Sequence, residues 1–361
     1  MALLWGREYT KGELVRYAGS MAQLAGARRC ELKDGRAEGV AAIDVRTGSG
    51  LDFTVLPDRA MDIAWAGYKG KPLCLVTKNG IVSSRYYEPE GDGWFRSYFA
   101  GLLTSCGLSN TGAACEDGGQ RYGQHGRLSS TPAAQVNVSE RWNGDEYEIE
   151  LEGRMRESNF YGENLLLTRT IRTALGWKKL VLRDVVENQG FSEVPLFLLY
   201  HFNAGFPLLD AGSRLLLNAA QTSFYDEAAQ AGRGEMLAFQ KPTHDYFRQV
   251  FFHRLRQDAE GNTLVAVVND RLEGGPLGLY LKFNRRQLPE FFEFKMMGEG
   301  DYQLGLEPSN CLPMGRAAER ARGGLKMIRP WEPQEFRIEI GVLEGEQEVA
   351  RTAAAIQSLV D

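Results

Sequence analysis

The chain has 361 residues, of which 43% are hydrophobic and 25% charged, with a formal net charge of -5 at pH 7. This ordinary globular balance provides enough apolar material for a large core, and the basic residues are too dispersed to form a nucleic-acid footprint. No stretch approaches the roughly 18 apolar residues of a membrane span, and the first apolar run is too short for a signal peptide. We therefore expect a cytoplasmic protein that binds neither nucleic acid nor a membrane.

Cysteine usage supports the same location. The five cysteines are widely spaced and include no CxxC pair. The sequence therefore predicts neither a disulfide framework nor a zinc site, and the thiols are expected to be reduced.

The first predicted element is a helix near the N-terminus. Apolar residues recur at helical spacing over Glu13–Ala25, which predicts a helical lead-in over about residues 10–28. The C-terminal tail has the same character, so a second helix is expected over about residues 347–360.

Between these ends the hydrophobic period is two. Ile43 and Val45 are followed by a Thr-Gly-Ser-Gly turn and by the alternating segment Leu51–Val55, which predicts a hairpin. A second hairpin is predicted for Asn164–Thr173 and Lys178–Glu187. Further predicted strands are Leu215–Asn218, Leu264–Asn269, Leu277–Phe283, Phe291–Met296 and Phe336–Val342.

Many strands at short spacing, separated by Gly and Asn, favour a sandwich over a parallel α/β sheet. No linker, charge block or repeat divides the chain. The sequence thus predicts a mainly β protein, with a large antiparallel β-sandwich and few short helices, in a single domain of residues 1–361.

Two of the four histidines stand in unusual settings. His125 lies between glycines in the loop Tyr122–Arg127, and glycine lets a backbone approach a ligand closely. The alternative is a histidine in a surface turn. His201 ends an apolar, strand-like run, and Asn203 follows at i+2, so both project from one strand face. A histidine there is suited to proton transfer, because its pKa is near neutrality. The alternative is a core histidine bonded to the backbone.

The carboxylate candidate is Glu307, which follows an alternating segment and directly precedes Pro308. We expect it at a strand end with fixed geometry. A partly buried glutamate there could serve as a general base, and the alternative is a solvated carboxylate.

Other chemistries lack their sequence signals. No glycine-rich phosphate loop opens a helix after a strand, and there is no GxSxG elbow. His125, His201 and Glu307 could converge, but no ligand pair has HxH or HxxxH spacing. The expected cofactor and metal requirement is therefore none.

Six segments together resemble a known superfamily, and they keep one order along most of the chain. They are Leu56–Ile63, Gly101–Leu108, His125–Arg127, Tyr200–Pro207, Gln249–Phe251 and Gly305–Pro308. The chain is similar to galactose mutarotases and aldose 1-epimerases, and it most closely resembles a branch of that superfamily catalogued as a domain of unknown function, DUF4432. The resemblance implies the galactose mutarotase-like supersandwich.

In that superfamily a histidine protonates the sugar ring oxygen while a glutamate takes the proton of the anomeric hydroxyl. The ring opens, and reclosure gives the other anomer. The resemblance implies that His201 is the acid, that Glu307 is the base, and that His125 holds ring hydroxyls or assists the acid. It also implies substrate hydrogen bonds from Asn203, Arg59, Gln249 and Lys295. The superfamily's Asn-Arg strand motif is not evident, and Arg59 lies in a different motif.

The expected function is that of a carbohydrate-binding, aldose 1-epimerase-like isomerase in carbohydrate metabolism, acting on a free sugar or sugar derivative. Two alternatives remain open. One is an isomerase or lyase for an unusual keto, deoxy or acidic sugar, and the other is a sugar-binding protein without turnover. The expected partner is a small-molecule carbohydrate, and the sequence is also compatible with a homo-oligomer.

Overall fold

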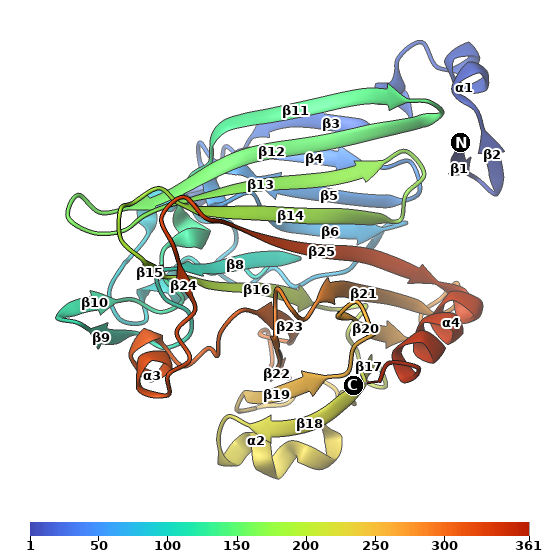
Figure 1. Cartoon of the computed structure of the whole chain (residues 1–361). Coiled ribbons are helices and arrows are strands. Elements are labelled where there is room, and N and C mark those ends of the chain that lie inside the picture. Colours follow the sequence, from blue (N-terminus) through green and yellow to red (C-terminus); the bar gives the residue numbers. More distant parts are fainter. Residues whose placement is uncertain (361) are drawn as a thin grey trace.

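Two large antiparallel sheets, stacked face to face, dominate the computed structural model, which describes residues 1–360 (Figure 1). The larger sheet has eleven strands. Its order is β18 (Ala219–Phe224), β19 (Gln249–Leu255), β22 (Glu290–Met296), β23 (Gln303–Ser309), β16 (Phe197–Ala204), β8 (Leu103–Leu108), β6 (Asp62–Tyr68), β5 (Leu51–Leu56), β4 (Ala41–Arg46) and β3 (Gly26–Glu31), with β7 (Lys71–Pro72) also paired to β6.

The second sheet has eight strands. Its order is β11 (Ala134–Asn143), β12 (Glu146–Ser158), β13 (Asn164–Ala174), β14 (Lys179–Asn188), β25 (Pro333–Glu344), β21 (Leu277–Asn284), β20 (Asn262–Asn269) and β17 (Arg214–Leu216). Three short pairs complete the strands of the described residues: β1 (Ala2–Leu4) with β2 (Arg7–Tyr9), β9 (Cys115–Asp117) with β10 (Gln120–Tyr122), and β15 (Val194–Pro195) with β24 (Met327–Ile328).

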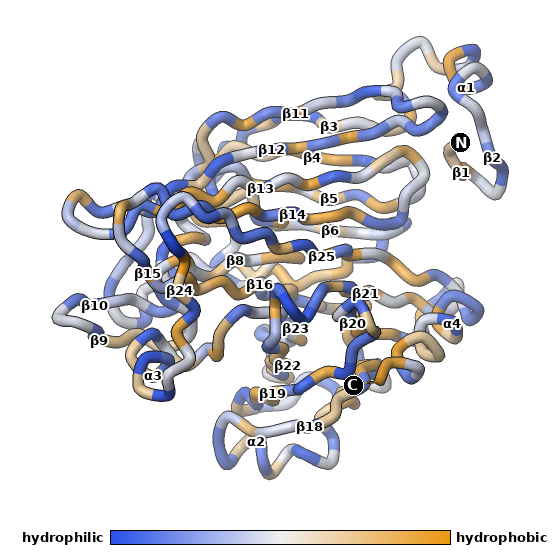
Figure 2. The backbone as a smooth tube through the Cα atoms, viewed as in Figure 1, coloured by the Kyte–Doolittle hydropathy of each residue, from blue (hydrophilic) through white to orange (hydrophobic). Residues whose placement is uncertain are grey.

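One core lies between the two large sheets. Strand residues alternate in hydropathy (Figure 2), because successive side chains point to opposite faces. Ile43 and Val55 of the larger sheet pack in the same buried cluster as Leu167 and Ile338 of the smaller one. The predicted antiparallel sandwich with few short helices is confirmed, and so are the hairpins β4–β5 and β13–β14.

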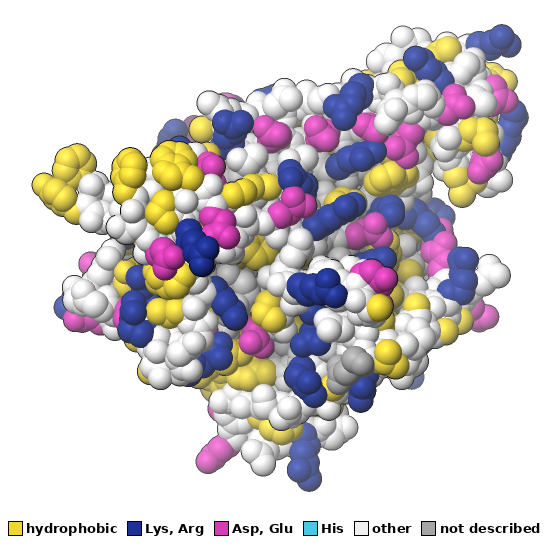
Figure 3. All heavy atoms as spheres, viewed as in Figure 1, with side chains coloured by type: hydrophobic (Ala, Val, Ile, Leu, Met, Phe, Trp, Pro, Cys, Tyr) yellow, Lys and Arg dark blue, Asp and Glu magenta, His cyan; other side chains and the backbone are white. Residues whose placement is uncertain are grey.

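The outer face of the smaller sheet is polar. Acidic and basic side chains are interspersed over this face of the molecule (Figure 3). Some of them form cross-strand ion pairs, such as Arg183 with Glu335 and Lys179 with Glu339. Such exposed pairs contribute little stability individually, since they are solvated in both the folded and unfolded states.

Four α-helices occur in the described part of the chain, namely α1 (Lys11–Tyr17), α2 (Glu227–Ala231), α3 (Arg316–Ala321) and α4 (Gly345–Gln357). The predicted C-terminal helix is confirmed as α4, which packs Val349 and Ile356 against Ala266 and Val268 of β20. Within residues 1–360, no helix is long and apolar enough to cross a membrane.

The predicted N-terminal helix is wrong beyond Tyr17. Ala18 takes an extended conformation, and Ser20 caps a separate 3-10 turn, Met21–Gln23, by accepting a hydrogen bond from the N–H of Ala22. Serine competes for backbone hydrogen bonds and favours caps over helix interiors. The strand β3 then begins at Gly26, within the helical lead-in that was expected over about residues 10–28.

Candidate active site

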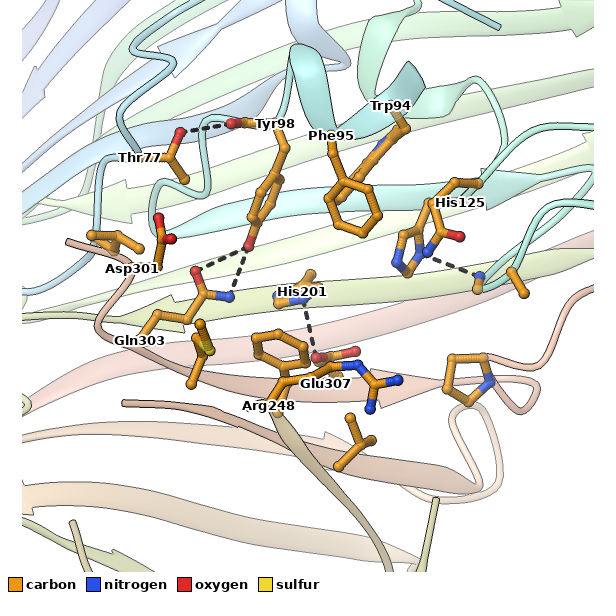
Figure 4. A pocket seen from close by; sticks show the side chains of 18 of the residues that line it. Thr77, Trp94, Phe95, Tyr98, His125, His201, Arg248, Asp301, Gln303 and Glu307 are labelled. Carbon is orange, nitrogen blue, oxygen red and sulfur yellow. Dashed lines mark hydrogen bonds and ion pairs between the residues drawn. The ribbon is translucent and has the colours of Figure 1, made fainter. Parts of the chain in front are cut away.

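A cavity of about 610 Å³ lies on the face of the larger sheet that points away from the sandwich core (Figure 4). The predicted residues His125, His201 and Glu307 all line it. Each of the three side chains is buried, with at most 8% of its residue surface exposed. The structure therefore brings together three residues that lie far apart in the sequence.

The alternation of β23 separates the cavity from the core. Gln303 and Glu307 line the cavity, whereas Leu304 and Leu306 pack between the sheets. Gly305 lies between the two cavity-lining residues on the same face. A Cβ atom at Gly305 would lie 2.7 Å from Oε1 of Glu307 and 2.9 Å from Cε1 of His201. Only glycine leaves room there for both functional side chains.

His201 and Glu307 are cross-strand neighbours. The pairing of Leu199 with Ser309, and of Phe202 with Leu306, sets their strands β16 and β23 in a register that places His201 opposite Glu307. The distance between His201 Nε2 and Glu307 Oε1 is 3.1 Å. Glu307 lies within β23 rather than at a strand end, so that detail of the expectation was wrong.

Burial controls the protonation of this pair. It lowers the pKa of His201 to about 3, with a smaller contribution from the neighbouring His125, and it raises the pKa of Glu307 to about 8. Both shifts have the same cause, because a buried site disfavours the charged form of either group. At neutral pH the pair therefore holds one transferable proton, shared between a carboxyl and a neutral imidazole.

One ring nitrogen of the pair is left over. Nδ1 of His201 is buried and has no hydrogen-bond partner among residues 1–360. Buried polar atoms without partners are rare in folded proteins, and among those of residues 1–360 only Nδ1 of His201 belongs to a residue that lines this cavity.

The backbone fixes His125. Its φ is +55°, and its N–H donates to the carbonyl of Gly112. The adjacent Gly126 has φ +70°, and a Cβ there would lie 2.4 Å from the carbonyl oxygen of Gly107. The close approach that the glycines allow is thus to strand β8. His125 Nδ1 accepts from the N–H of Gly112 at 3.3 Å, so its neutral ring carries the proton on Nε2. Burial lowers the pKa of His125 to about 4.

Asn203 does not line the cavity, although it shares a strand face with His201. Its Nδ2 donates to the carbonyls of Ala100 and His201, and its Oδ1 accepts from the Tyr98 hydroxyl. Its polar hydrogens are therefore used within the protein. The expected sugar contact is corrected to a contact with Tyr98, which does line the cavity.

Arg59 is also removed from the expected sugar contacts. It is fully buried, and its guanidinium donates to the backbone carbonyls of Ser129, Val82 and Ser97. Burial lowers its pKa to about 10. Its position joins three loops instead of facing the cavity.

Gln249 and Lys295 lie on the wrong face of the sheet. They pair across β19 and β22, while the next pair, Val250 with Phe294, lines the cavity. Because faces alternate along a strand, Gln249 and Lys295 point to the other side. There Lys295 Nζ donates to the carbonyls of Glu235 and Ala238.

Several cavity residues were not predicted. Trp94 stacks on Tyr98 with ring centroids 4.6 Å apart, and it also lies 4.5 Å from the His125 ring (Figure 4). Trp94 and Tyr98 belong to a segment without regular alternation, so the hydrophobic periodicity of the sequence did not indicate them. Gln303 could have been found, because it precedes Glu307 by four residues and therefore shares its strand face.

The donor set does not form a recognisable metal site. Among residues 1–360, no group of three His, Cys, Asp or Glu side chains is arranged to hold a metal ion. The chemistry that these groups can perform themselves is proton transfer.

Comparisons with known proteins bear on the fold and the family. A candidate aldose 1-epimerase from Klebsiella pneumoniae is 26% identical, with a TM-score of 0.88 over 94% of this chain and 91% of its own. A galactose mutarotase-like protein from Clostridium acetobutylicum is 14% identical, with a TM-score of 0.60 over 89% of this chain and 99% of its own. A galactose 1-epimerase from Lactobacillus acidophilus is 13% identical, with a TM-score of 0.56 over 89% of this chain and 100% of its own. At such low identities the last two show a shared fold alone.

No curated protein matches the sequence significantly. The family described as a domain of unknown function, DUF4432, matches residues 37–342, which is most of the chain. The chain therefore belongs to the DUF4432 family and has the galactose mutarotase-like fold.

Proposed function

We propose that this protein is a cofactor-independent sugar 1-epimerase, which interconverts the anomers of a free aldose or a close derivative. The observation that carries the proposal is the contact between His201 and Glu307, 3.1 Å apart at a buried cavity. The similarity of this chain to the candidate aldose 1-epimerase from Klebsiella pneumoniae supports the same class of reaction.

The reaction needs two proton movements on one sugar. The proton of the anomeric hydroxyl leaves for a base, a proton reaches the ring oxygen, and the bond between C1 and the ring oxygen breaks. Rotation about C1–C2 and reversal of these steps give the other anomer. A pair that shares one proton can supply the acid and the base together. The proton first passes from Glu307 to His201 across their 3.1 Å contact. His201 then protonates the ring oxygen while the Glu307 carboxylate takes the anomeric proton, and ring closure returns both protons.

The surroundings of the pair suit a sugar. His125 presents its Nε2–H as a donor for a ring hydroxyl, and the exposed rings of Phe95 and Phe247, which also line the cavity, are available for stacking. An aromatic ring presents a large apolar face, and a pyranose has apolar C–H groups that can pack on such a face.

The first test is turnover itself. Freshly dissolved single anomers of a panel of aldoses are expected to equilibrate faster with the enzyme than without it, as followed by polarimetry or by NMR of the anomeric protons. Exhaustive chelation should leave the rate unchanged. Binding without acceleration, for every sugar in the panel, would instead favour the sugar-binding alternative.

The pH dependence of kcat/KM is expected to be bell-shaped, since kcat/KM reports the free enzyme. The pair loses its shared proton as pH rises through the Glu307 pKa of about 8, and it gains a second proton as pH falls towards the His201 pKa of about 3. Protonation of His125, whose pKa is about 4, adds to the acid limb. The measurement subtracts the base-catalysed background at each pH. A corrected rate that kept rising well above pH 8 would contradict this protonation scheme.

A further inference from the structure

A chain of hydrogen bonds beside the His201–Glu307 pair fixes which way a cavity-lining amide points. It runs from Asn203 through Tyr98 to Gln303 (Figure 4 shows Tyr98 and Gln303). Each member can be oriented from the one before it, starting at backbone carbonyls whose role is unambiguous.

Asn203 is oriented first. One amide atom lies 3.1 Å from the carbonyl oxygen of Ala100 and 2.8 Å from that of His201. Carbonyl oxygens only accept, so this atom must be the NH₂ group. The Asn203 oxygen therefore faces the Tyr98 hydroxyl at 2.8 Å and must accept its proton.

Tyr98 is oriented next. A phenol has one proton, and that of Tyr98 is committed to Asn203. The Tyr98 oxygen then accepts from Nε2 of Gln303 at 3.1 Å. Oε1 of Gln303 lies 3.4 Å from the same hydroxyl oxygen, but no proton remains for that contact.

Gln303 is consequently left with an acceptor that lacks a donor. Only 4% of its surface is exposed, and it lines the cavity. Within residues 1–360, Oε1 has no hydrogen-bond donor other than the committed Tyr98 hydroxyl. A buried acceptor without a proton is unfavourable, so the site favours a ligand that brings one.

The position of this acceptor relates it to the reacting end of the sugar. Gln303 and Glu307 lie on one face of β23 with Gly305 between them. Oε1 of Glu307 and Cε1 of His201 both lie over Gly305, which is two residues, or roughly 7 Å along the strand, from Gln303. A sugar whose anomeric carbon lies at Glu307 would extend its far end towards Gln303.

We infer that Gln303 is a specificity-determining residue, whose Oε1 accepts a hydrogen bond from a sugar hydroxyl remote from the anomeric carbon, with Tyr98 as its positioning residue. The inference rests on the proposed function for the placement of the anomeric carbon. The substrate is thus an aldose that is hydroxylated at this point. A ketone or a methylene group there would leave Oε1 without a proton, which disfavours the corresponding keto and deoxy sugars.

The test compares sugars that differ by one hydroxyl. The probes are D-galactose and D-glucose, each with its deoxy analogues lacking the C4 or the C6 hydroxyl. The quantity compared is the ratio of kcat/KM for galactose or glucose to kcat/KM for its own 4-deoxy or 6-deoxy analogue. For wild type at least one of these ratios should be about 100 or more, because a site built to bond a hydroxyl rejects the compound without it. In Gln303→Met the ratio should fall to within a few-fold. In Tyr98→Phe, which frees the amide to rotate, it should also fall.

The controls separate specificity from damage. Gln347→Met, on the exposed side of α4, should leave the ratio at its wild-type value, and circular dichroism should show each variant folded. Equal kcat/KM for parent and analogues in wild type, or an unchanged ratio in Gln303→Met, would overturn the inference. If wild type turns over none of the sugars, the proposed function fails. Ligand-observed NMR with the same sugars then gives the ratio of the dissociation constants of analogue and parent, which tests the inference about Gln303 separately. No binding of any probe would overturn both.

Discussion

Replacing Glu307 by glutamine is expected to lower kcat/KM for anomer interconversion by about 100- to 10,000-fold, the usual contribution of a positioned acid or base. The amide keeps the shape of the side chain and can still contact His201 at the 3.1 Å separation. It cannot take up or release the shared proton. His201→Asn should cause a comparable loss, and the double variant should be little worse than either, because both groups act on one proton. Rates are measured by polarimetry on a fresh anomer.

The larger sheet itself provides a matched control. On its opposite face, His253 Nε2 lies 3.1 Å from Glu293 Oε2, and both side chains are fully buried. Glu293→Gln should alter stability and leave kcat/KM per folded molecule unchanged. Near-wild-type rates in Glu307→Gln would show that this carboxyl carries no essential proton, and the sugar-binding alternative would then be preferred.

Replacing Arg169 by methionine is expected to lower the free energy of unfolding by about 3–5 kcal/mol, the usual result of removing one partner from a buried ion pair. Arg169 is fully buried, and it donates to Asp184 at 2.9 and 2.7 Å and to Asp62 at 2.9 Å. Without it, two carboxyl groups remain in the core with no cation between them. The loss is measured as the change in the extrapolated free energy from urea unfolding.

An exposed ion pair gives the comparison for that measurement. Arg183 contacts Glu335 across β14 and β25, and both side chains are more than 40% exposed. Arg183→Met is expected to cost less than about 1 kcal/mol. Similar losses for Arg169→Met and Arg183→Met would mean that the buried carboxyls relax by taking up protons, a route open to Asp62, whose pKa burial already raises to about 6.

Alternation along strands predicted most of the sandwich, because each large sheet has one face in the common core. The hairpin β13–β14 shows this clearly: Leu165, Leu167 and Ile171 of β13 and Leu180 and Leu182 of β14 are buried in the core, and the residues that alternate with them include partly exposed ones such as Thr168, Arg172 and Arg183. The N-terminal helix was overestimated for the complementary reason. Met21 and Leu24 pack against the core from a turn, so their spacing reflects burial and not a continuous helix.

The site was predicted less completely, because a strand buried on both faces carries no sign of which face holds the cavity. Lys295 alternates with Phe294 just as Gln303 alternates with Leu304, yet Phe294 and Gln303 line the cavity and Lys295 does not. Asn203 shares a face with His201 as expected, but its side-chain amide donates both hydrogens to neighbouring backbone carbonyls. Only tertiary pairing decides these positions.

The segment that contains Arg59 illustrates a second reason why the site was predicted incompletely. It was one of the sequence signals of the superfamily, and a functional role was the natural reading. In the structure Arg59 ties loop carbonyls together and Asp62 joins Arg169 in linking the two sheets. A distinctive motif can therefore mark the scaffold of a site instead of its chemistry.

The two-faced alternation of β22 and β23 also bears on how such proteins diverge. Substitution at Met296 or Gln303 alters the surface that a ligand meets, while Leu304 and Leu306, one residue away, continue to fill the core. Within a single strand, the residues that face the cavity can therefore change during evolution while the residues that face the core are kept. Proteins only 13–14% identical to this chain keep its fold, and the face towards the cavity is where new substrate preferences could arise by point mutation without a loss of foldability.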